Sequence, residues 1–125
     1  MNDDNGKTVL VVEDNDLNMK LFHDLLEAHG YNILQTKDGM EALRMAREHR
    51  PDLILMDIQL PDLDGYEAAR RIKANPALRS IPIIAVTSYA LSGDDEKAFE
   101  AGCDAYASKP FSPRELLAKI REFLS

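Results

Sequence analysis

Short apolar runs alternate with amphipathic stretches along the chain, and this alternation predicts strands and helices in turn. Continuous apolar runs are typical of strands that are buried on both faces. Apolar residues every three or four positions, as at Leu17, Leu21 and Leu25, are typical of a helix with a buried face. The predicted strands are Thr8–Glu13, Tyr31–Thr36, Leu53–Asp57, Ile81–Thr87 and Ala105–Ser108, and the predicted helices are Asp16–His29, Gly39–His49, about Tyr66–Ala74, Gly93–Ala101 and Pro113–Leu124.

The boundaries of these elements carry their own signals. Gly30 follows the first helix, as glycine does at helix ends, and Pro51 blocks continuation of the second. Ser112 and Glu115 form a capping box for the last helix. Five strand–helix units with short connections predict an α/β fold, a doubly wound parallel sheet of five strands flanked by five helices. We expect residues 1–125 to form one domain with an ordered core of about 7–124.

The composition of the chain limits which partners and which cellular compartment we expect. A net charge of −7 argues against nucleic-acid binding and against anionic membranes, both of which favour basic surfaces. The single cysteine, Cys103, excludes an intramolecular disulfide, which fits a reduced compartment. The chain has no apolar run of the roughly 20 residues that a membrane span needs, and its start is polar. We therefore expect a cytoplasmic protein without membrane contact. We also expect the chain to be a monomer.

Acidic residues end two of the apolar strands. Asp57 closes the run Leu53–Met56, and Glu13 and Asp14 follow Val9–Val12. In open α/β sheets the carboxyl ends of parallel strands form the edge at which ligands bind. Three carboxylates at one edge repel one another unless a cation lies between them, and hard oxygen ligands suit Mg²⁺. The sequence therefore predicts a magnesium site at Glu13, Asp14 and Asp57.

Two further strands end in groups that can hold a phosphoryl oxygen. The fourth ends at Thr87 and Ser88, which carry hydroxyl groups, and the fifth is followed by Lys109, which carries an ammonium group. Carboxylates, a metal ion, a hydroxyl and a lysine are the groups that phosphoryl transfer requires, because its catalysis consists of positioning and charge neutralisation. With Asp57 as nucleophile, the product would be an acyl phosphate.

These residues, in this order and in these strand contexts, resemble the receiver domain of two-component response regulators. The resemblance extends from about Lys7 to Leu124 and implies the flavodoxin-like fold of that family. Two stretches, one from Val12 to Leu26 and one from Asp52 to Pro61, resemble more narrowly the single-domain receivers that act in cell division.

The resemblance also implies a role for each residue. Asp57 would accept a phosphoryl group from the phosphohistidine of a histidine kinase or a histidine phosphotransfer protein. Asp14 would bind Mg²⁺ directly and Glu13 largely through water, and the backbone carbonyl of Gln59 would complete the protein ligands. The chain would act as a signalling switch, catalysing only its own phosphorylation and dephosphorylation, rather than as an enzyme on other substrates.

The remaining implied roles concern the switch. Thr87 and Lys109 would each hold a phosphoryl oxygen. Tyr106 would swing inward as Thr87 moves, and a downstream regulatory protein would read the change. The bond between Lys109 and Pro110 is the candidate for a cis peptide.

The first helix carries more apolar surface than a core-facing stripe needs. Six apolar residues spread over roughly 200° of the helical wheel, about twice the width of a buried stripe. We therefore expect Leu17 and Met19, at the margins, to be partly exposed and to dock the kinase. The alternative is that the extra width packs against the last helix.

One other function remains open, and a second fits the sequence poorly. The chain could be the regulatory receiver module of a larger enzyme or transcription factor, which the sequence does not separate from an autonomous switch. An aspartate-nucleophile phosphatase usually carries a second aspartate two residues after the nucleophile. Gln59 occupies that position, which argues against a phosphatase.

Overall fold

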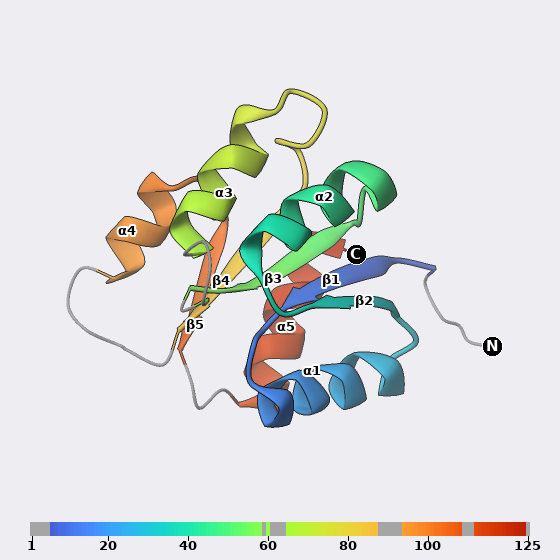
Figure 1. Cartoon of the computed structure of the whole chain (residues 1–125). Helices are drawn as coiled ribbons and strands as arrows, with labels where there is room; N and C mark the ends of the chain where they lie inside the picture. The colour runs from blue at the N-terminus through green and yellow to red at the C-terminus, as the bar shows by residue number, and fades with distance from the viewer. Residues whose placement is uncertain (1–5, 59, 61–64, 88–93, 109–111, 125) are drawn as a thin grey trace.

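Five parallel strands form one sheet at the centre of the molecule (Figure 1). The computed structural model describes residues 6–58, 60, 65–87, 94–108 and 112–124. The strands lie in the order β2-β1-β3-β4-β5, so that β3, which ends in Asp57, is central. Their bounds are β1 (Thr8–Val12), β2 (Asn32–Thr36), β3 (Leu53–Asp57), β4 (Ile83–Thr87) and β5 (Ala105–Ser108).

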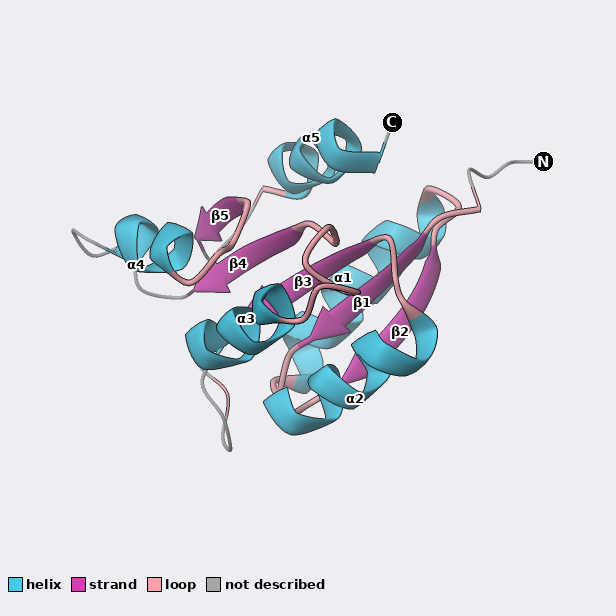
Figure 2. Cartoon of the chain, turned by 90° about the horizontal axis from the view of Figure 1, so that it is seen from above, coloured by secondary structure: helices cyan, strands magenta, loops and turns pink. Residues whose placement is uncertain are grey.

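Helices cover both faces of the sheet, as the sequence predicts. Figures 1 and 2 show α1 and α5 on one face and α2, α3 and α4 on the other. Each lies within two residues of its predicted bounds: α1 (Asp16–Ala28), α2 (Gly39–His49), α3 (Gly65–Ala74), α4 (Asp94–Glu100) and α5 (Pro113–Leu124). The doubly wound parallel fold is confirmed. None of the helices in the described part of the chain is long and apolar enough to cross a membrane.

The sheet separates two apolar cores. Strand residues alternate between them, because successive side chains on a strand point to opposite faces. Leu55 packs with Phe22 of α1 and Leu116 of α5, whereas Met56 packs with Ala69 and Ile72 of α3. Every residue of β3 and β4 is buried, which explains why their sequences are continuous apolar runs.

Lys73, near the end of α3, forms hydrogen bonds to the segments that lead into β4 and β5, and we call this group of bonds the Lys73 clamp. Its Nζ donates to the carbonyl oxygens of Arg79 and Ile81 at 3.0 and 2.8 Å, and to the Asp104 carboxylate at 2.9 Å. The same carboxylate oxygen accepts the backbone N–H of Ile83 at 2.9 Å. Next to this clamp, Cys103 is a buried free thiol between α4 and β5.

Candidate functional site

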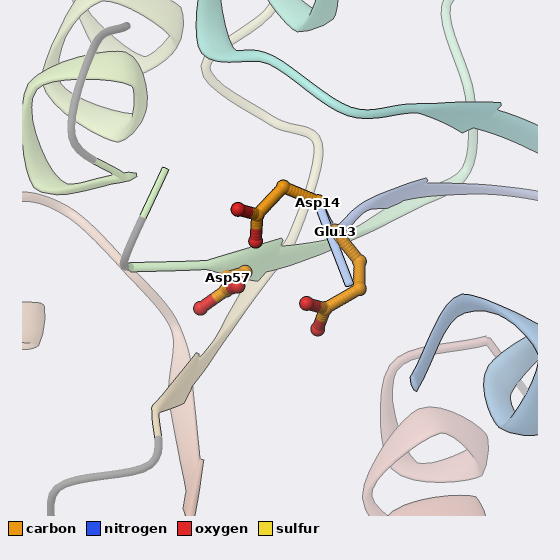
Figure 3. A group of neighbouring side chains, drawn as sticks. All are labelled: Glu13, Asp14 and Asp57. Atoms are coloured by element: carbon orange, nitrogen blue, oxygen red, sulfur yellow. The ribbon is translucent and has the colours of Figure 1, made fainter. Parts of the chain in front are cut away.

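Strands β1 and β3 bring the predicted acidic residues together. The two strands are hydrogen-bonded neighbours, and Val12 pairs with Met56. Glu13 and Asp14 therefore leave β1 beside the point at which β3 ends in Asp57. One carboxylate oxygen from each of the three residues lies within 4.8 Å of the other two. Figure 3 shows the three carboxyl groups gathered around one shared space.

Burial makes this cluster unfavourable without a cation. The exposed fraction of Glu13 is 0% and that of Asp57 is 3%, whereas Asp14 is exposed. Two buried carboxylates so close to a third have little water to screen their repulsion. The donors are all hard oxygens, and one of the three is open to solvent. This arrangement fits a divalent cation of the Mg²⁺ type, which retains water alongside few carboxylates.

Asn15 fixes the Glu13 side chain, a role that the sequence argument did not assign. The backbone N–H of Asn15 donates to Glu13 Oε2 at 3.2 Å. The Asn15 side chain in turn caps α1 by accepting from the N–H of Asn18 at 2.9 Å. An asparagine just before an amphipathic stretch is a recognisable N-cap signal, so the position could have been found from the sequence.

Gly65, the first residue of α3, lies against the backbone of Asp57. Its N–H donates to the carbonyl of Ile58 at 2.9 Å. A Cβ at this position would lie 2.4 Å from the Asp57 carbonyl oxygen and 2.7 Å from Ile58 Cα. No side chain fits there. The sequence around Gly65 is typical of a turn, but in the structure this glycine allows the start of α3 to lie directly against the strand end that carries Asp57.

Thr87 lies on β4, next to the strand that carries Asp57. Asp57 pairs with Val86, so Thr87 is one position further along at the same edge, and its exposed fraction is 3%. Tyr106 pairs with Ala85 on the other side of β4, and both belong to the core on the α3 side. Because strand side chains repeat every second residue, Thr87 shares the face of Ala85 and Tyr106. The proposed switch pair therefore lies on one face of adjacent strands.

Some predicted site residues lie outside the described part of the chain. These are Gln59, Ser88, Lys109 and Pro110. The metal contact from the Gln59 carbonyl, the phosphoryl contact from Lys109 and the cis bond before Pro110 stay predictions.

The exposed apolar surface of α1 differs from the prediction at one residue. Leu17 is 68% exposed, as expected, but Met19 is only 8% exposed, so the expectation for Met19 is wrong. Met19 packs into the core with Phe22 and Leu26. Leu21, at 47% exposure, takes its place beside Leu17. The two exposed leucines are one helical turn apart.

Comparison with known proteins identifies the family. Residues 9–121 match the response regulator receiver domain. The polar-differentiation response regulator DivK of Brucella anthropi is 54% identical over 118 residues, which cover 94% of this chain and 96% of DivK.

Solved structures give the same result. The receiver domain of a Pseudomonas aeruginosa sensor histidine kinase, with a magnesium ion coordinated in its active-site cleft, has a TM-score of 0.89 and 42% identity over 95% of this chain and 98% of its own. The receiver domain of Ssk1 from Saccharomyces cerevisiae, co-crystallised with the histidine phosphotransfer protein Ypd1, has a TM-score of 0.88 and 32% identity over 95% and 89% of the two chains. The chain belongs to the receiver domains of two-component response regulators.

Proposed function

We propose that this receiver accepts a phosphoryl group on Asp57 from a phosphohistidine and changes its partner binding as a result. The observation that carries the proposal is the position of Asp57, a buried carboxylate at the end of the central strand with Glu13 and Asp14 within 4.8 Å. Such a nucleophile is held by a rigid sheet and faces a site suited to charge neutralisation.

The transfer needs only one bond exchange. A carboxylate oxygen of Asp57 attacks the phosphorus atom, an oxygen–phosphorus bond forms and the nitrogen–phosphorus bond to the donor imidazole breaks. The imidazole leaves with the electron pair of that bond. Hydrolysis of the acyl phosphate by water would return Asp57 to its carboxylate form, so the chain would catalyse only its own phosphorylation and dephosphorylation.

Glu13, Asp14 and Asp57 would hold the Mg²⁺ ion. When bound, the ion would neutralise the charge on the phosphoryl oxygens and on the carboxylates. Asp14 is the exposed member of the cluster, so it is the carboxylate through which a partly hydrated ion would enter. Asn15 keeps Glu13 in place through its backbone N–H.

Thr87 and Tyr106 would transmit the change. A hydroxyl drawn toward the phosphoryl group leaves room on the face of β4 that Tyr106 shares. The partners expected from this chemistry are a histidine kinase or a phosphotransfer protein upstream and a regulatory protein downstream. The co-crystal of Ypd1 with the Ssk1 receiver supports the upstream class. We place this exchange in the cytoplasm.

Acetyl phosphate tests the acceptor directly. The purified chain, incubated with Mg²⁺ and acetyl phosphate, should gain one labile phosphoryl group by intact mass spectrometry. Asp57→Asn should abolish the gain while leaving the circular dichroism spectrum unchanged, because the substitution keeps the side-chain volume. Asp24→Asn, which removes an exposed carboxylate on α1, is the matched control and should be labelled like the wild type. Full labelling of Asp57→Asn would show that another residue is the acceptor.

A further inference from the structure

Residues of α2, of α3 and of the turn after α3 line a cleft of about 280 Å³. The two helices lie on the sheet face opposite α1 (Figure 2). Three of the lining residues lie on one side of α2, at intervals of three and four positions along the helix. The other three lie on α3 and in the turn after it, at intervals of four and three positions. The lining residues are Met40, Leu43, Arg47, Arg71, Asn75 and Leu78. The cleft therefore follows about two helical turns, or roughly 10 Å.

The bottom of the cleft is apolar. Leu78 is only 2% exposed, and Leu43 is partly buried against the core. Met40 is 54% exposed, and its flexible thioether adapts to varied apolar partners. An apolar side chain placed here would remove this surface from water.

Two arginines make the cleft cationic in a chain of net charge −7. Arg71 donates Nε to Glu67 at 3.0 Å and lies with Nη1 3.8 Å from the Met40 sulfur, so part of its guanidinium is already engaged. Arg47 is exposed and forms no ion pair or side-chain hydrogen bond with the described residues. Neighbouring Arg44, by contrast, pairs with Glu41 and Glu48. Arg47 is thus fully available to a ligand, whereas Arg71 is available only in part.

The size of the cleft limits what it can take. Sites for drug-sized ligands and cofactors usually enclose about 300–1,000 Å³. At about 280 Å³ the cleft lies just below that range, and it has room for one or two side chains of a protein segment.

We propose that this cleft docks a short acidic and apolar segment of a partner protein. One apolar side chain of the segment would lie on Leu43 and Leu78 beside Met40. A neighbouring aspartate or glutamate would pair with Arg47, and a second would reach the free edge of Arg71. The helices α2 and α3 lie on the opposite face of the sheet from α1, so this partner does not compete with a protein bound to α1. Docking in this cleft does not require phosphorylation of Asp57.

The test uses a panel of six-residue peptides in which one Leu, Ile, Phe or Met is flanked by Asp or Glu. A matched panel carries Lys in place of each acid. Titration into ¹⁵N-labelled full chain should shift the amides of residues 40–47 and 71–78 for members of the acidic panel only. Arg47→Ala should weaken that binding at least about fivefold, since a charge-assisted hydrogen bond is lost. Arg44→Ala, on the same helix with the same change of charge, should weaken it less than about twofold.

Each other outcome overturns the proposal. Amides that no acidic peptide shifts would mean that the cleft docks no such segment. Equal weakening by Arg44→Ala and Arg47→Ala would mean that overall charge, not the cleft, attracts the peptide. The same shifts with inorganic phosphate alone would make this an anion site. The same shifts on raising the protein concentration without peptide would make a second copy of the chain the occupant.

Discussion

Gly65 sets how closely α3 approaches the strand end that carries Asp57. A Cβ there would lie 2.4 Å from the Asp57 carbonyl oxygen, and a backbone atom cannot rotate out of the way as a side chain can. We expect Gly65→Ala to destabilise the fold by about 1–3 kcal/mol, the usual cost of overpacking. It should also slow labelling by acetyl phosphate, because Asp57 moves with its backbone. Urea unfolding and the labelling rate measure the two effects.

Gly6→Ala is the control for that substitution. A Cβ at Gly6 meets no atom within 4 Å, although the φ angle of +69° adds some local strain. Its labelling rate should equal that of the wild type. A normal labelling rate for Gly65→Ala would mean that α3 relaxes away without moving the acceptor.

Cys103 predicts a loss of stability at alkaline pH. Burial, reinforced by the negative charge of Asp104, raises the pKa of its thiol from 9.0 to about 12. In the unfolded chain the thiol ionises at a lower pH than in the folded protein. The contribution of the buried neutral thiol to the unfolding free energy is therefore fully present below pH 9 and declines as the pH rises toward 12. The difference in unfolding free energy between wild type and Cys103→Ala should therefore shrink between pH 8 and pH 10.5. A constant difference would contradict the burial argument.

The acidic residues of the site can be predicted from the sequence, whereas the role of Gly65 can be seen only in the structure. Glu13, Asp14 and Asp57 follow apolar strands, and parallel topology then requires them to meet at one edge. Gly65 carries no such signal. Its sequence context fits any turn, and only the packed position of α3 against β3 shows that a side chain is excluded there.

At the scale of elements, the apolar surface of α1 divides into a buried arc and an exposed arc, with the partly buried Leu25 between them. At about 100° per residue, Met19, Phe22 and Leu26 fall within roughly 60°, and Leu17 and Leu21 lie about 150° away. The first arc is buried and the second exposed. The sequence predicted the excess apolar width correctly but placed Met19 on the wrong arc, because a wheel does not show which arc faces the sheet.

The exposed arc of α1 predicts that substitutions there slow phosphorylation by a protein phosphodonor but not by a small-molecule phosphodonor. Leu17→Ser with Leu21→Ser should slow phosphorylation by a histidine kinase or phosphotransfer protein at least about tenfold, because exposed apolar anchors are lost from the interface. Labelling by acetyl phosphate should stay unchanged, since a small donor needs no helix surface. Both rates are followed by intact mass spectrometry.

Lys20→Ser with Asp24→Ser is the matched control, because it removes an exposed ion pair from the same helix without removing apolar surface. It should leave the kinase-dependent rate within about twofold of the wild type. An equal fall of both rates in the leucine variant would mean that the change damages the fold.

For the whole molecule, the acidic cluster predicts that Mg²⁺ stabilises the folded state. The ion binds carboxylates that only the fold brings within 4.8 Å, so it stabilises by mass action. At an Mg²⁺ concentration ten times the dissociation constant, the unfolding free energy rises by about 1.4 kcal/mol, which raises Tm by roughly 3–6 °C. Differential scanning calorimetry with and without MgCl₂, against NaCl of equal ionic strength, measures it.

The control for the metal prediction is Asp14→Asn, which removes the exposed carboxylate of the cluster. This variant should melt higher than the wild type without Mg²⁺, because less repulsion remains, and should gain less from the ion. An unchanged Tm of the wild type in excess Mg²⁺ would contradict the electrostatic account of the cluster.

The strand order also bears on how the protein is made. The first three strands of the chain are neighbours in the sheet; β4 then pairs with the free edge of β3, and β5 with the free edge of β4. A growing chain can therefore add each new strand to an existing edge as it leaves the ribosome. The three carboxylates are all synthesised by residue 57, before Thr87 and Tyr106 exist. The α5 helix is synthesised after all five strands, so the core that it shares with α1 closes only after β5 has been made.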